Sequence, residues 1–150
     1  MTGERFTDPQ LALDDFLDEI LVVCPECGAC ASVLPIGAGK PSMFAPRRLT
    51  CGLCGYNKDW AGKTVKRSAD SEGRDEYFRQ RLLLQARFIA NTLWAYNHRH
   101  LQLLEDFVGA TLRQSANANH HGLVTRLPKW IKSAHHRSAI LAAIKKMRER

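Results

Sequence analysis

The sequence has no long hydrophobic run. No stretch approaches the roughly 20 apolar residues that a transmembrane helix needs, although 45% of the 150 residues are hydrophobic and 25% are charged. This balance is typical of a folded soluble chain. The first residues also lack the basic segment followed by an apolar one that marks a secretory signal. We therefore expect a cytoplasmic protein whose five cysteines are thiolates or metal ligands rather than disulfides.

Recognisable catalytic motifs are missing as well. Residues 37–42 (GAGKPS) contain a Gly-Lys pair, but a phosphate-binding loop needs glycine where Leu34 stands and Ser or Thr where Pro41 stands. No serine, histidine and acid occur together in a nucleophile context. The sequence therefore predicts no enzyme and no small-molecule substrate.

The histidines form three close pairs. They are His98, His100, His120, His121, His135 and His136. None has a cysteine or carboxylate companion at ligand spacing, and neighbours one or two residues apart do not share a helix face. We expect surface positions for them rather than a second metal site.

Two Cys-x2-Cys pairs stand in the middle of the chain, in residues 24–28 (CPECG) and 51–55 (CGLCG). Each pair places two sulfurs on one side of a short turn, and the glycine after each second cysteine suits a backbone that turns at positive φ. Zinc takes four tetrahedral ligands, commonly thiolates, and four protein ligands leave no open position for catalysis. We therefore predict one structural Zn²⁺. Its ligands are Cys24, Cys27, Cys51 and Cys54.

Two points about these cysteines stay open at this stage. A four-thiolate iron centre has similar ligand chemistry, and spacing does not distinguish it from zinc. Cys30 is the odd cysteine, three residues after Cys27. It is either a small buried hydrophobe, which we favour, or a competing metal ligand. A thioredoxin-type redox pair is a weaker alternative, because it needs a βαβ context that is missing here.

The N-terminal half divides into three segments. Residues 1–23 contain one base and six acids and predict an acidic helix that starts at residues 7–9 (TDP) and ends in a short strand. Residues 24–60 read as strand, loop and strand, a hairpin that returns the second cysteine pair to the first, and this segment resembles a zinc ribbon. Residues 61–75 form a polar loop.

The next segment, 76–97, is ambiguous. Hydrophobic residues alternate with arginine and glutamine over much of 81–89, and 92–96 (TLWAY) is rich in β-formers. We favour a second β-hairpin that extends the ribbon, although a helix over 81–89 stays open.

Residues 98–150 read as a helical region with a basic tail. Asn97 is a candidate N-cap for a helix over 98–114, a short helical turn follows Pro128, and Ser133 caps a final helix over 134–148. The predicted fold class is therefore α+β. It comprises a short N-terminal helix, a small antiparallel zinc ribbon, an additional hairpin and C-terminal helices.

The two cysteine turns resemble a zinc ribbon, the rubredoxin-type knuckle pair found in transcription factor IIB and in many bacterial proteins. Residues 92–97 (TLWAYN), 100–101 (HL) and 126–134 (RLPKWIKSA) are similar to segments of a group of small, uncharacterised bacterial zinc-ribbon proteins. The resemblance implies the fold and the zinc but no established activity. Some members have further cysteines in the second hairpin, whereas 81–92 has none, so it does not imply a second metal.

Positive charge increases towards the C-terminus. The chain has a formal net charge of +7, and residues 115–150 hold eight bases and one acid. Such an excess attracts phosphate or an acidic partner. Our hypothesis is a non-catalytic module that associates with DNA or RNA through basic side chains. The candidate contacts are Arg47, Arg48, Lys58, Lys63, Lys66, Arg67, Lys129, Lys132, Lys145 and Lys146.

The alternative function is a protein-interaction adaptor. Its amphipathic terminal helices would dock on a partner through an apolar stripe such as Ile140, Leu141, Ile144 and Met147. Trp94, Tyr96 and Trp130 could stack on bases, but such aromatics more often belong to the core or its rim. We expect no membrane association.

Overall fold

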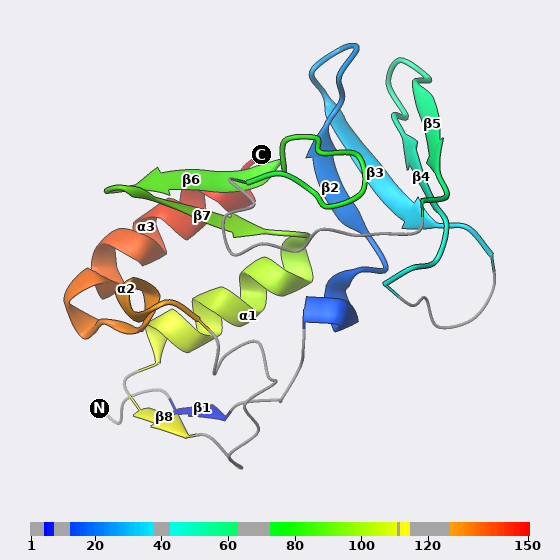
Figure 1. Ribbon diagram of the computed structural model, residues 1–150. Coiled ribbons are helices and arrows are strands. Elements are labelled where there is room, and N and C mark those ends of the chain that lie inside the picture. The colour runs from blue at the N-terminus through cyan, green and yellow to red at the C-terminus, as the bar shows by residue number, and fades with distance from the viewer. Residues whose placement is uncertain (1–4, 8–12, 38–42, 63–72, 111, 115–126) are drawn as a thin grey trace.

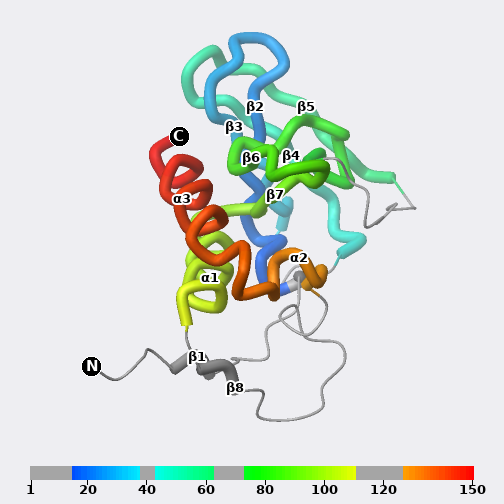
Figure 2. The backbone as a smooth tube through the Cα atoms, turned by 90° about the vertical axis from the view of Figure 1, so that its left-hand side faces the viewer, coloured from blue at the N-terminus to red at the C-terminus, as the bar shows by residue number. Residues whose placement is uncertain are grey.

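The computed structural model describes residues 5–7, 13–37, 43–62, 73–110, 112–114 and 127–150. A four-stranded antiparallel sheet lies next to a separate two-stranded hairpin and two longer helices (Figure 1). The helices α1 and α3 run side by side, which Figure 2 shows from a second direction. The predicted α+β class is confirmed.

In chain order the elements are β1 (Arg5–Thr7), the 3-10 turn η1 (Leu13–Phe16), β2 (Ile20–Val23), β3 (Cys30–Pro35), β4 (Arg47–Thr50), β5 (Asn57–Trp60), β6 (Leu84–Phe88), β7 (Asn91–Ala95), α1 (His98–Gly109), β8 (Leu112–Gln114), α2 (Lys129–Lys132), the 3-10 turn η3 (Ala134–His136) and α3 (Arg137–Arg148).

Strands β2 to β5 form the ribbon sheet, and every neighbouring pair is antiparallel. The register places Ile20 opposite Val33 and Val33 opposite Leu49, and all three side chains are buried. They form one row across the inner face of the sheet. Alternate connections of an antiparallel sheet emerge at the same end. The β2–β3 and β4–β5 loops therefore meet there, at the top of Figure 1.

The second hairpin, β6 with β7, is confirmed as strand rather than helix. Its turn includes Ile89 at a φ of 55°. Its open end is bonded to strand β2 of the ribbon. The backbone N–H of Leu21 donates to the Tyr96 carbonyl at 2.8 Å, and the Leu83 N–H donates to the Leu21 carbonyl at 3.0 Å. The ribbon and the hairpin therefore share one backbone hydrogen-bond network.

The predicted N-terminal helix is present only in part. Leu13–Phe16 forms a single 3-10 turn, Arg5–Thr7 is a strand, and residues 8–12 lie outside the described part of the chain. The short strand predicted at the end of this segment is confirmed as β2, which begins at Ile20 opposite Val33. The pairing of this β-branched segment with β3 outweighs the helical periodicity of the residues before it.

Helix α1 ends earlier than its sequence predicts. Asn97 caps it as expected, but the chain becomes extended at Ala110, and Leu112–Gln114 forms strand β8. This strand pairs in parallel with β1, so a non-local partner replaces the intrahelical bonds that residues 112–114 would have made. The predicted break at 115–122 lies within 115–126, outside the described residues.

The C-terminal helices form where the sequence predicts them. Residues 129–132 form α2, and the Ser133 side chain accepts the N–H of His135 to start η3, which leads into α3. In α3, Ile140, Ile144 and Met147 are completely buried in the protein's own core. The stripe proposed for docking on a partner therefore packs inside this chain, apart from the half-buried Leu141.

Asn97 joins three parts of the fold. Its side-chain oxygen accepts the N–H of His100 at 2.9 Å and caps α1. Its amide nitrogen donates to the carbonyls of Phe16 at 3.0 Å and Glu19 at 2.8 Å. One buried side chain thus fixes the start of α1 against the segment that leads into β2.

His100 is buried, contrary to the expected surface position. Its ring stacks on Phe16 with centroids 4.9 Å apart, and its Nδ1 accepts the Tyr96 N–H at 3.0 Å. Burial lowers the pKa of His100 to about 3, so the ring is neutral near pH 7. His98 and His100 look alike in the sequence, but His98 is exposed, whereas helix α1 turns His100 towards the core. His135 is also exposed and His136 is half-buried, while His120 and His121 lie outside the described residues.

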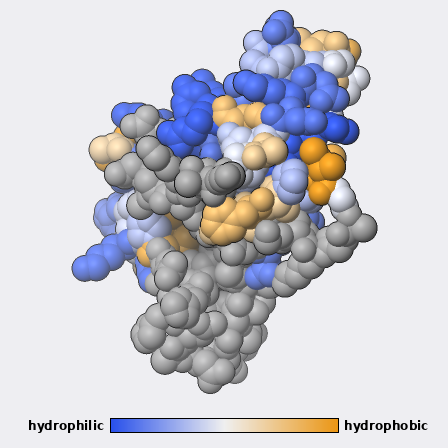
Figure 3. Space-filling model, turned by 45° about the vertical axis from the view of Figure 1, so that its right-hand side comes forward, coloured by the Kyte–Doolittle hydropathy of each residue, from blue (hydrophilic) through white to orange (hydrophobic). Residues whose placement is uncertain are grey.

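A few large hydrophobic side chains are exposed in the described part of the chain. On the face in Figure 3, hydrophobic areas are separated by hydrophilic ones. Within the described segments, no helix has both the length and the hydropathy to cross a bilayer. The large exposed hydrophobic side chains of these segments are Leu34, Ile36, Phe44, Leu53 and Ile89.

The neutral state of His100 predicts a loss of stability in acid. An unfolded chain binds a proton at an ordinary pKa of 6.5, whereas the folded chain resists protonation until about 3. His100 therefore makes its full contribution to the free energy of unfolding above pH 6.5. Between pH 6.5 and 3 this contribution falls by about 1.4 kcal/mol per pH unit. Urea unfolding at several pH values measures this slope.

The matched control is His100→Asn, whose amide oxygen can accept the Tyr96 N–H without titrating. The variant should show a shallower pH dependence over this window, while the shared contribution of the cysteines cancels between the two proteins. Equal slopes in both proteins would refute a depressed pKa for His100.

Candidate metal centre

The two cysteine turns have the same backbone structure. In the first, the Cys24 N–H donates to the Ala29 carbonyl at 2.7 Å, and the Gly28 N–H donates to the Cys24 carbonyl at 2.9 Å. The second turn repeats both bonds at equivalent positions, each at 2.9 Å. The two glycines have φ values of 76° and 80°, in the left-handed region that the sequence predicts. Two matching knuckles therefore face each other at one end of the sheet.

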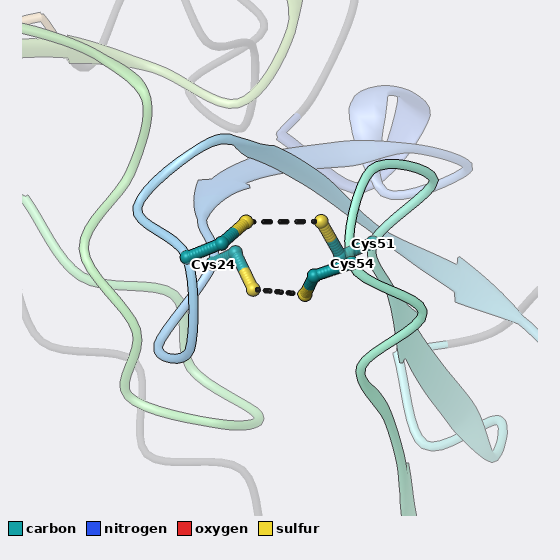
Figure 4. A group of neighbouring side chains, drawn as sticks. Cys24, Cys51 and Cys54 are labelled. Carbon is teal, nitrogen blue, oxygen red and sulfur yellow. Dashed lines mark hydrogen bonds between the residues drawn. The ribbon is translucent and has the colours of Figure 1, made fainter.

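All four sulfurs meet between the knuckles. The Sγ atoms of Cys24 and Cys54 are 3.6 Å apart, and those of Cys27 and Cys51 are also 3.6 Å apart (Figure 4). The four atoms all lie within 4.8 Å of one another. Sulfurs at the corners of a tetrahedron with bonds of about 2.3 Å stand about 3.8 Å apart, whereas a disulfide needs about 2.05 Å. The four cysteines are thus positioned to bind one metal ion.

The charges of these sulfurs are strongly coupled. The backbone N–H groups of Cys54 and Leu53 point at the Cys51 sulfur and lower its pKa to about 6. At Cys54 the Tyr56 N–H favours the thiolate, but desolvation and the three neighbouring thiols outweigh it and raise the pKa to about 12. Four thiolates this close repel one another, so a cation between them is what stabilises all four.

Cys30 does not belong to this group. The four-cysteine group excludes it, and its side chain is exposed rather than buried as we expected. It begins β3 just outside the knuckle, where alternation turns its side chain to the outer face while Ala31 is buried.

Arg47, a predicted phosphate contact, is completely buried. Its Nη1 donates to the Leu17 carbonyl, and its guanidinium carbon lies 4.7 Å from the centre of the Tyr77 ring. The alternation of β4 directs Arg47 and Leu49 to the inner face and Arg48 outward. Arg47 is therefore a core residue and is removed from the candidate nucleic-acid surface.

Tyr77 is held in place by a turn that the sequence did not reveal. The buried carboxylate of Asp75 accepts backbone N–H groups from Tyr77 at 2.9 Å, Phe78 at 2.7 Å and Gln80 at 2.7 Å. Burial raises the pKa of Asp75, although these three bonds oppose the shift. The Tyr77 hydroxyl in turn donates to the Met43 carbonyl at 2.6 Å.

The other predicted basic contacts do not form one surface around the cysteines. On the ribbon, Arg48 pairs with Asp59 at 2.7 Å and Lys58 is exposed. Lys63, Lys66 and Arg67 lie outside the described residues. On the C-terminal helices, Lys132 is half-buried. The exposed ones there are Lys129, Lys145 and Lys146.

A groove between β6 and α3 gathers basic residues that the sequence did not connect. Its lining includes three exposed cationic residues, which we call its rim: Arg87 from β6, and Lys146 and Arg150 from the C-terminal end. Arg87 and Arg150 were missed because only the packing of α3 on β6 places them together. The strand alternation that exposes Arg87 was the available signal.

Comparison with protein-family models, with curated proteins and with solved structures found no match. The likeness to a zinc ribbon thus rests on the four clustered cysteines and on the two knuckles in this chain.

The geometry predicts that loss of one sulfur abolishes metal binding. Cys24→Ser and Cys51→Ser each remove a ligand that no other described cysteine replaces, so metal content should fall from about one ion per chain to nearly none. The ribbon should lose stability with it, because metal binding is coupled to folding. Elemental analysis and thermal melting measure both effects.

Cys30→Ser is the matched control, since it removes a thiol of the same segment from outside the cluster. It should retain the metal and the melting temperature of the unmodified protein. Full metal content in Cys24→Ser with an unchanged melting temperature would show that these four residues are not the ligand set.

Proposed function

We propose that this protein is a non-catalytic module in which one structural Zn²⁺ holds the ribbon, and in which a cationic surface on β6 and α3 binds nucleic acid. Zinc is supported by four sulfurs that converge from two knuckles, because a closed four-thiolate set is typical of structural zinc sites. Colourless protein with one zinc per chain supports this assignment, and a coloured iron protein contradicts it.

The observation that supports nucleic-acid binding is the charge of the β6–α3 groove. Its described lining includes Arg87, Lys146 and Arg150 and no acidic side chain. Lys145 adds a further exposed cation next to Lys146, and Glu149 is the exposed acid beside Arg150. Arg148, by contrast, is occupied by Glu105, with Nη1 and Oε2 2.9 Å apart.

Helix α2 extends this surface. Its Trp130 ring stacks on Phe88 of β6 with centroids 5.4 Å apart, and the exposed Lys129 precedes Trp130 on this short helix. Cations that follow one surface can each neutralise a phosphate and release a counterion, which supplies most sequence-independent affinity. The ribbon offers fewer cations for phosphate contacts, because Arg47 is buried and Arg48 is paired with Asp59.

A single substitution on each surface tests this proposal. Lys146→Gln removes one cation from the groove, and Lys58→Gln removes the same charge from ribbon strand β5. Fluorescence anisotropy with labelled nucleic acid between about 50 and 200 mM salt measures affinity and its salt slope. Lys146→Gln should weaken binding. It should also reduce the magnitude of the slope of log K against log salt concentration by about 0.7 to 0.9.

Lys58→Gln should leave both quantities nearly unchanged. If Lys58→Gln weakens binding more than Lys146→Gln does, the nucleic-acid-binding surface lies on the ribbon instead. No binding at the low-salt end would refute the nucleic-acid proposal as a whole.

A further inference from the structure

The groove between β6 and α3 has a hydrophobic floor as well as a cationic rim. Its volume is about 270 Å³. That is just below the roughly 300–1,000 Å³ of typical small-molecule pockets, so it has room for one planar group. Its lining residues are Ala86, Arg87, Phe88, Ala139, Ala142, Ala143, Lys146, Met147 and Arg150.

We propose that this groove takes one unstacked base of a single-stranded nucleic acid, while the rim cations contact the adjoining phosphates. This inference rests on the proposed function and narrows it to a substrate class. A base within a duplex is stacked on both sides and cannot enter, so a duplex would contact the rim alone.

The floor of the groove is open because its helix residues are small. Ala139, Ala142 and Ala143 are spaced three and four residues apart, which places them on one face of α3. Ala139 and Ala142 are exposed. These short side chains leave room for a flat ring to contact this part of the helix.

An ordered aromatic ring adjoins the alanines. Phe88 is held by Trp130, with an interplanar angle of 15°, and by the His136 ring, which meets it edge-on at a centroid distance of 5.3 Å. The Phe88 ring therefore has little rotational freedom to lose when a ligand binds. The part of this ring that lines the groove can contact a base of any sequence, because every base has an apolar π face.

The polarity of the site favours a base over an acidic peptide. Both ligands satisfy Arg87, Lys146 and Arg150, but a peptide would also bring backbone N–H and C=O groups onto a floor of alkyl and aromatic carbon. Polar groups buried without partners are costly. A base presents its apolar face to the floor and keeps its polar edge at the open mouth.

The test compares a single strand with a duplex on the full-length, metal-loaded protein. The probes are a labelled oligothymidylate of about ten nucleotides and a hairpin duplex of equal phosphate number. Ala142→Leu fills the groove with a good helix former and changes no charge. It should weaken single-strand binding about tenfold, the value of one stacked base, and leave duplex binding unchanged.

Ser138→Leu is the matched control, because it adds the same side chain at an exposed position of α3 that does not line the groove. It should bind both probes as the unmodified protein does. Ala139→Leu provides a second groove variant if Ala142→Leu melts at a lower temperature.

The outcomes separate this inference from the proposed function. Equal binding of both probes, with no effect of either groove variant, would overturn the single-strand site and leave nucleic-acid binding intact. Binding of neither probe would overturn both. An oligoglutamate of matched charge that competes as well as the oligothymidylate would identify an acidic peptide as the occupant and overturn the inference.

Discussion

The fold depends on one constraint, which is that four sulfurs from two separate loops share one small volume. The sheet topology satisfies this constraint by bringing the β2–β3 and β4–β5 connections out at the same end. The knuckles satisfy it locally, since each glycine at positive φ turns the chain directly after the second cysteine. The row of buried residues from Ile20 to Leu49 fixes the register that aligns the two knuckles. Metal site and sheet therefore specify the same arrangement.

Both polar and hydrophobic contacts attach the rest of the molecule to this ribbon. Backbone bonds join β2 to the open end of the second hairpin, and Asn97 joins α1 to the segment before β2. The buried side chains of ribbon, hairpin and helices form one continuous core. The hairpin and α3, which line the cationic groove, therefore belong to this core, and no cysteine lines the groove.

Short-range patterns in the sequence predicted much of this structure. The knuckles, the second hairpin, the Asn97 cap and the start of the last helix follow from the spacing of a few residues. The failures are non-local. Strand pairing decides that residues 112–114 are extended, and tertiary packing decides that Arg47 and His100 are buried and that Cys30 is exposed. The same limit hid the groove, whose basic rim combines residues about 60 positions apart in sequence.

Buried Arg47 makes the ribbon depend on the segments on either side of it in the sequence. A ribbon defined only by its knuckles would be portable, since it could be cut out and joined to another protein. Here the guanidinium in strand β4 lies over Tyr77 and donates to the Leu17 carbonyl, so partners on both sides of the ribbon in sequence complete its surroundings. A fragment limited to residues 24–60 would keep its four sulfurs but would expose a cation built for the interior. The natural unit of transfer is therefore the ribbon together with its flanking segments.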